Sequence, residues 1–129
     1  MAEYAMKKVL KLSFDEALVR IPEVLKEEGF GVLTEIDVQA TMKKKLDVDF
    51  RRYRILGACN PPFAHQALSQ EIDIGVMMPC NVVVYEGEDG MTHVTAIDPG
   101  VTMGMLGKPK LAELGRQVAA KLGRALERL

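Results

Sequence analysis

Two Cys-Asn dipeptides hold the side chains of this sequence that are best suited to chemistry. Each lies beside a proline: Cys59-Asn60 precedes one, and Cys80-Asn81 follows one. Together they contain both cysteines of the chain. A thiol can act as a nucleophile or line an apolar site, and an amide can both donate and accept hydrogen bonds with a ligand. If the fold brings the two dipeptides together, they form the candidate site.

Two interpretations of the thiols remain open. Cys59 comes directly before a predicted helix start, where backbone amides can lower the pKa of a thiol and favour the reactive thiolate. Alternatively, Cys59 and Cys80 are small buried apolar residues, while Asn60 and Asn81 only cap a helix or shape a turn. The second interpretation requires nothing beyond ordinary packing, and we favour it. The repeated asparagine keeps the first one open.

A metal site is not expected. Zinc favours cysteine and histidine ligands, but Cys59, His65 and Cys80 do not follow a zinc-binding spacing. His65 falls on the solvent side of its predicted helix, and His93 is expected about 13 Å from Cys80 along the sheet. No hydrolase, phosphate-loop or cofactor-binding motif is found, so no cofactor is expected.

A cluster of arginines is a second candidate for ligand recognition. Arg51, Arg52 and Arg54 lie at and just before the start of a predicted strand. Guanidinium groups can receive a carboxylate or a phosphate. Ion pairs with the nearby Asp47 and Asp49 explain the cluster equally well, so both interpretations stay open.

The composition is that of an ordinary globular domain. The chain of 129 residues is 48% hydrophobic and 27% charged, and its length predicts a single domain over residues 1–129. The net charge of −1 argues against a nucleic-acid partner. The sequence shows neither a signal-peptide pattern nor an apolar run of membrane-spanning length. We therefore expect a cytoplasmic protein with reduced thiols and no membrane partner.

Hydrophobic periodicity predicts the elements on either side of the candidate site. Ser13 and Glu16 form a capping box at the start of the first helix. Pro22 is expected to kink or divide that helix, and Gly29 to end it in the left-handed conformation. Asn60 is expected to cap a later helix that begins with a proline. The predicted strands are 7–13, 30–38, 53–59, 81–86 and 91–97, and the predicted helices follow Ser13 and cover 40–46, 60–71 and the segment after residue 109.

The last two strands are predicted to form a hairpin. A glycine-flanked turn at residues 87–90 pairs Glu86 with Met91, which places His93 opposite Val84 and on the same sheet face as Cys80. The glycines and prolines between residues 99 and 109 predict a flexible connector after this hairpin.

This order of elements predicts an α+β fold with two layers. A curved antiparallel sheet of about five strands would be backed by two or three helices on one face. The other face then needs polar side chains or a partner. Together with the adaptable methionines Met103 and Met105 of the connector, it is a candidate dimer surface, and we expect a homodimer.

The sequence resembles the uncharacterised "domain of unknown function 302" family over nearly its whole length. The resemblance lies in residues 53–62 (YRILGACNPP) and 74–86 (IGVMMPCNVVVYE), with support from residues 28–32 (EGFGV), 35–37 (EID) and 98–99 (DP). It implies a TATA-binding-protein-like fold, in which a curved antiparallel sheet is backed by helices. It also marks the two Cys-Asn segments as a family feature and implies a small cytoplasmic protein, but it brings no activity with it.

Three hypotheses for function follow. The first is a small-ligand-binding domain without catalysis, in which Asn60 and Asn81 hydrogen-bond the ligand and Cys59 and Cys80 line its pocket. The second is a thiol-based enzyme or redox protein that uses Cys59 or Cys80. The third is a dimerisation or partner-interaction module that binds no ligand.

Overall fold

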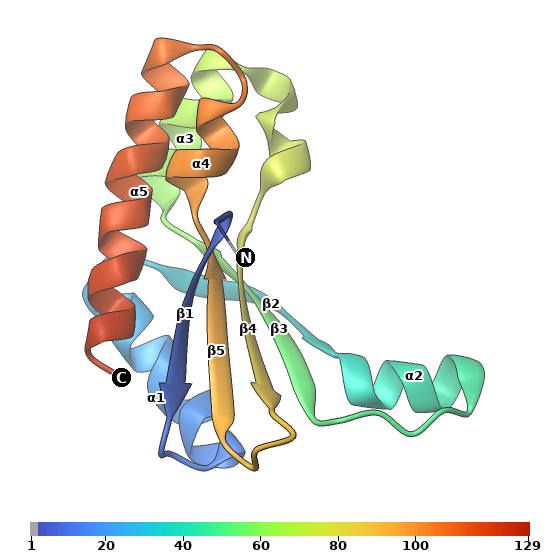
Figure 1. Cartoon of the computed structure of the whole chain (residues 1–129). Helices are drawn as coiled ribbons and strands as arrows, with labels where there is room; N and C mark the ends of the chain where they lie inside the picture. The colour runs from blue at the N-terminus through green and yellow to red at the C-terminus, as the bar shows by residue number, and fades with distance from the viewer. Residues whose placement is uncertain (1–2) are drawn as a thin grey trace.

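The computed structural model describes residues 3–129 and consists of a five-stranded antiparallel sheet with helices on one face (Figure 1). The strand order is β1-β5-β4-β3-β2, so β1 and β2 form the edges. The predicted two-layer α+β fold is confirmed. The elements are β1 (Ala5–Leu10), α1 (Phe14–Glu27), β2 (Gly31–Asp37), α2 (Val38–Leu46), β3 (Tyr53–Cys59), α3 (Pro61–Gln70), the 3₁₀ helix η1 (Ile72–Met77), β4 (Cys80–Glu86), β5 (Thr92–Ile97), α4 (Pro99–Gly104) and α5 (Pro109–Glu127).

The first helix begins at the predicted capping box. The Ser13 hydroxyl accepts a hydrogen bond from the Glu16 backbone N–H at 3.1 Å, and the Glu16 carboxylate accepts one from the Ser13 N–H at 2.9 Å. The prediction that Pro22 could divide this helix is wrong, because α1 continues through it. Ile21 and Val24, on either side of Pro22, are both buried in the same core, and this packing stabilises the helix across the proline.

The end of α1 follows the predicted left-handed stop. Gly29 has φ +88°, a conformation that costs a residue without Cβ little. The Phe30 N–H donates to the Leu25 carbonyl at 3.0 Å, and both side chains are buried in the core. This Schellman-type ending turns the chain directly into β2.

The main core lies between the sheet and two helices, α1 and α5, which lie on the same side of it in Figure 1. Alternation along the strands selects its members: Val82 and Val84 of β4 are fully buried under the helices, while Val83 between them faces the other way. Among residues 3–129, no helix packs flat against the second face of the sheet (Figure 1). No helix within residues 3–129 has the length and apolarity needed to cross a lipid bilayer.

The β4–β5 hairpin differs from its prediction by one residue. Glu86 pairs with Thr92 rather than with Met91, because the Gly87 N–H bonds to the Met91 carbonyl at 2.9 Å and draws that residue into the turn. A slip of one residue moves every side chain of a strand to the opposite face. His93 therefore lies opposite Tyr85, on the face away from the helices, and not on the face of Cys80 as predicted.

The segment predicted as a flexible connector contains a short helix. Asp98 caps α4, because its carboxylate accepts a hydrogen bond from the Gly100 N–H at 2.9 Å, and Pro99 takes the first helical position. α4 packs tightly on α5: a Cβ on Gly115 would stand 2.4 Å from the Pro99 carbonyl oxygen. Together with α3 and η1, these two helices extend the molecule beyond the end of the sheet (Figure 1).

Helix α2 is the exception to this packing. It projects from the body of the protein near the far ends of β2 and β3 (Figure 1), and none of its residues is buried. Asp37 caps its start and Asp47, at φ 53°, ends it in the left-handed conformation.

Candidate ligand-binding cavity

A cavity of about 300 Å³ lies where the sheet ends and the short helices begin. Its walls come from the end of β3, the start of β4, α3, η1, α4 and the first half of α5. The lining is almost entirely apolar, and Leu33 and Met77, which are well exposed, lie at its mouth. Lining side chains from the four helices include Phe63, Ala64, Ile74, Met103, Leu114 and Val118.

Three of the four predicted site residues meet at this cavity. The end of β3 and the start of β4 are neighbours, with Ala58 directly opposite Cys80, as the candidate site requires. Cys59, Asn60 and Cys80 all line the cavity. Asn81 does not: it follows Cys80 in the strand, is exposed, and belongs to the opposite sheet face. The sequence therefore located the region, but the second asparagine contributes nothing to its wall.

Asn60 is a structural bridge as well as a lining residue. It occupies the N-cap position of α3, but its side chain makes no capping bond there. Instead, its Nδ2 donates to the Glu28 carbonyl at 3.1 Å and ties the start of α3 to the end of α1. Its Oδ1 accepts no hydrogen bond from the described part of the chain, in which every fully buried side-chain polar atom has a partner. This oxygen is therefore accessible and can accept a hydrogen bond from a ligand.

The environment of Cys80 favours the neutral thiol. Burial raises the pKa of Cys80 from its ordinary value of 9.0 to about 11, and the nearby Cys59 contributes to the same shift. At neutral pH this sulfur is protonated and behaves as a small apolar group. A thiolate at Cys59 would also find little support from α3, whose first two residues, Pro61 and Pro62, have no N–H to donate.

The other sequence candidates lie elsewhere. His65 is exposed on α3, and His93 stacks on Tyr85 and contacts Asp89 at 3.0 Å. Within residues 3–129, no three histidine, cysteine or acidic side chains are placed to hold a metal ion.

The arginine cluster forms surface ion pairs, though not with the predicted partners. Arg54 pairs with Glu35 and Asp37, while Asp47 and Asp49 pair with Lys43 instead. The remaining two pairs are Arg51–Glu88 and Arg52–Asp15. These guanidinium groups are already matched with carboxylates, which leaves the ion-pair interpretation as the one that fits.

A carboxylate that the sequence did not single out fixes helix α5. Glu28, at the end of α1, is buried and contacts Arg124 at 3.1 Å and Arg128 at 2.7 Å. The hydrogen bond from Arg128 holds the pKa of Glu28 below its usual range. The Lys8 ammonium donates to the Leu126 and Glu127 carbonyls at the end of the helix, at 3.0 and 3.3 Å, and to the backbone oxygen of Leu129 beyond it at 2.8 Å. This anchors the C-terminal half of α5, so that its other half can extend past the sheet and form a cavity wall.

The lining residues of η1 and α4 were not predicted as site residues. One signal for α4 was present: Asp98-Pro99 has the same cap-and-proline form as Asn60-Pro61, which correctly marked α3. For η1 the sequence offers no comparable signal, because a short 3₁₀ helix has no hydrophobic period of its own.

The fold and the cavity define a two-layer α+β domain with an apolar pocket at one end of its sheet, and comparison with known proteins gives its family. The sequence profile described as "Domain of unknown function DUF302" matches residues 6–129. The chain belongs to this family. It is similar to a solved structure, the uncharacterised conserved protein DUF302 from Bacillus stearothermophilus, with 31% sequence identity, a TM-score of 0.91 and 98% of each chain covered. No curated protein matches the chain.

Proposed function

We propose that this protein binds a small, largely apolar molecule in the cavity at the end of its sheet. The observation that carries the proposal is the combination of size and lining. Small-molecule sites typically have volumes of about 300–1,000 Å³ and apolar walls with a few polar groups that orient the ligand. The cavity has about 300 Å³, and its lining includes the polar side chain of Asn60, whose Oδ1 accepts no hydrogen bond from residues 3–129. The preferred ligand is therefore an uncharged molecule with an apolar body and one hydrogen-bond donor.

The energetics of the cavity support the same proposal. A closed, unfilled cavity of about 300 Å³ would cost roughly 7 kcal/mol at ~24 cal/mol per Å³. That is comparable with the whole stability of a small domain, which is about 5–15 kcal/mol. The open mouth lowers this figure, because water enters part of the space. A ligand that replaces this water with apolar contacts would still recover a substantial fraction of the lost packing.

The protonated state of Cys80 supports binding over thiol catalysis. A nucleophilic or redox-active cysteine needs an accessible thiolate, and a thiol with a pKa near 11 supplies almost none at neutral pH. In this proposal the two thiols are part of the apolar wall. Their sulfur atoms are polarisable and suit contact with an aromatic or alkyl ligand.

Fluorescence of N-phenyl-1-naphthylamine, an uncharged apolar amine that emits strongly when shielded from water, tests the proposal. The wild-type chain should enhance its emission saturably. Ala64→Leu, which fills part of the cavity from α3, should weaken binding by at least about tenfold, because the added methylenes occupy ligand space. Ala112→Leu is the matched control, since Ala112 is half-buried on α5 but does not line the cavity. Equal binding by both variants would contradict the proposed site.

A further inference from the structure

The face of the sheet opposite the helices carries a regular pattern of side chains. Register and alternation place two cross-strand rows on it. One row contains Tyr53, Tyr85, His93 and Val9, and the other contains Ile36, Ile55, Val83, Thr95 and Lys7. Val9 is 52% exposed and Ile36 is 49% exposed. Apolar and aromatic side chains of β2, β3 and β4 thus adjoin one another on this face, Val9 adds an apolar group on β1, and β5 contributes His93 and Thr95. No helix within residues 3–129 packs flat against them (Figure 1).

The aromatic row makes this face rigid. The rings of Tyr53 and Tyr85 stack with centroids 5.5 Å apart, and those of Tyr85 and His93 stack at 5.0 Å. Asp89 then holds the His93 ring through a contact of 3.0 Å to its Nε2. Because the rings stack on one another, their faces are already occupied and they present their edges outward. Such a row suits packing against another protein surface better than intercalation of a flat ligand.

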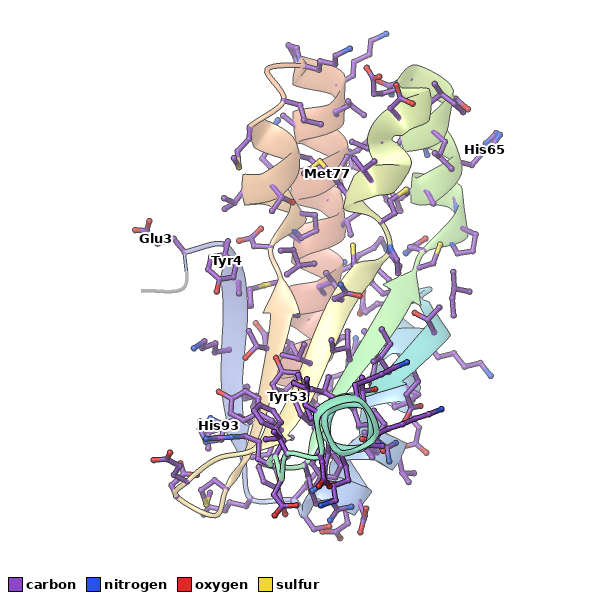
Figure 2. All side chains as sticks on the ribbon, turned by 90° about the vertical axis from the view of Figure 1, so that its right-hand side faces the viewer. Glu3, Tyr4, Tyr53, His65, Met77 and His93 are labelled. Atoms are coloured by element: carbon purple, nitrogen blue, oxygen red, sulfur yellow. The ribbon has the colours of Figure 1, made fainter. Side chains whose placement is uncertain are left out.

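Helix α2 stands out from the same face. Figure 2 shows it end-on in front of the sheet, and Figure 1 shows it projecting away from α1 and α5. It has nine residues and none is buried. An isolated helix shorter than about 12 residues is marginal in water, so its stability must come from packing. Leu46 at its end is 66% exposed, and Val48 and Phe50, which follow it, are also exposed.

We propose that this face and α2 together bind a second copy of the chain, and that the two copies pack sheet against sheet with each α2 reaching alongside the partner. The dimensions fit: nine residues of helix extend about 13 Å, and two sheets packed face to face lie about 10 Å apart. Each α2 helix is therefore long enough to span the gap between the sheets and contact the sheet of the other copy. A two-fold axis requires that both copies use the same surface patch. The open sheet face and α2 of one copy together form such a patch, which can pack against the same patch of the other copy.

The sheet face reaches the area of a stable dimer interface only together with α2. Five strands at ~4.8 Å spacing and about six residues at ~3.3 Å cover on the order of 500 Å² in projection, and α2 adds to this. A stable protein interface buries about 800 Å² per partner. The net charge of −1 creates little repulsion between copies. The cavity lies at the other end of the sheet from α2, at the end of β3 and the start of β4.

Analytical ultracentrifugation of the full chain and two variants tests this dimer. The wild type should sediment as a species of twice 14.3 kDa at micromolar concentrations. Leu46→Glu should raise the dimer dissociation constant by at least about 100-fold, because the change enters the interface twice. Val19→Glu should leave it unchanged: Val19 is also 66% exposed, but it lies on α1 in the helix layer.

Hydrogen exchange keeps the test independent of any effect of these variants on folding. In the wild type, the amides of α2 should be protected at high protein concentration and lose protection on dilution, since nothing in the monomer buries this helix. A monomer at every concentration would overturn the proposal and leave the face to a different protein. A dimer that Leu46→Glu does not weaken, or that Val19→Glu dissociates, would also overturn it.

Discussion

Helix α5 passes through two regions that are packed very differently. Its C-terminal half, with Leu122 and Ala125, closes the main core against a continuous sheet. Its N-terminal half, with Leu111 and Leu114, belongs to a smaller cluster beyond the sheet, beside the cavity. A sheet offers an unbroken surface that side chains can fill. The three short helices α3, η1 and α4 do not, and the hollow beside them is the candidate site.

Truncating one leucine in each region should give the clearest difference in unfolding free energy between the two regions. Leu122→Ala should cost about 3–5 kcal/mol of unfolding free energy, because it opens a void in a filled core. Leu114→Ala removes the same atoms from the same helix, but beside a space that already exists, so its cost should be at least about 1 kcal/mol smaller. Denaturant unfolding of both variants measures the difference. Equal costs would show that the two regions are packed alike.

Adding one methyl group to α5 should sharpen the contrast. Gly115→Ala would place Cβ 2.4 Å from the Pro99 carbonyl oxygen, and a backbone atom cannot move aside without displacing α4. We expect a loss of about 1–3 kcal/mol together with weaker probe binding. Gly123→Ala on the same helix meets only the Met6 sulfur at 3.8 Å, and should be neutral or stabilise by up to about 1 kcal/mol. Thermal unfolding of the pair checks both values, and an equal effect of the two would disprove the tight α4–α5 contact.

The thiol of Cys80 should make stability depend on alkaline pH. Its pKa is raised in the folded state, so the unfolded chain loses this proton first as pH rises. Stability should therefore fall between pH 9 and about 11, by at most about 2.7 kcal/mol for a shift of two units. Below pH 9 the thiol contributes no slope. Cys80→Ala should remove this component, and the difference between its pH profile and that of the wild type isolates it from other titrating groups. If the stability of the wild type and of Cys80→Ala changed with pH in the same way, the Cys80 thiol would be solvent-exposed rather than buried.

Replacing each of the two asparagines by alanine should give the smallest difference in stability among these comparisons. Asn60→Ala removes the bond to the Glu28 carbonyl and should cost about 1–2 kcal/mol. Asn81→Ala changes an exposed side chain and should stay within about 0.5 kcal/mol. Denaturant midpoints of the two variants measure this, and a larger cost for Asn81 would mean that it has a partner on the open face.

The sequence predicted the regular layers well, because their signals are local and periodic. The capping box of Ser13, the left-handed Gly29 and the third strand were all found from neighbouring residues. The hairpin register failed for a local reason of another kind: Asp89 and Gly87 bind Met91 into the turn, and a hydrophobic pattern does not count turn residues.

The candidate site was predicted only in part, because its walls depend on how distant segments pack. Adjacent strand ends correctly brought Cys59 and Cys80 to one region. The same reasoning could not tell that Asn81 faces away, since that depends on which face the helices cover. Nor could it find the contributions of Ile74 and Met103, which come from short helices with little periodic signal of their own.

Methionine methyl groups offer the most direct test of ligand binding in the cavity. Met77, Met78 and Met103 line it, whereas Met42 on α2 and Met91 in the hairpin turn lie outside. In a ¹³C-methyl NMR titration with N-phenyl-1-naphthylamine, the proposed function predicts saturable shifts for the three lining methyl groups and unchanged signals for the other two. Signals that all stay fixed, or shifts confined to Met42 and Met91, would contradict it.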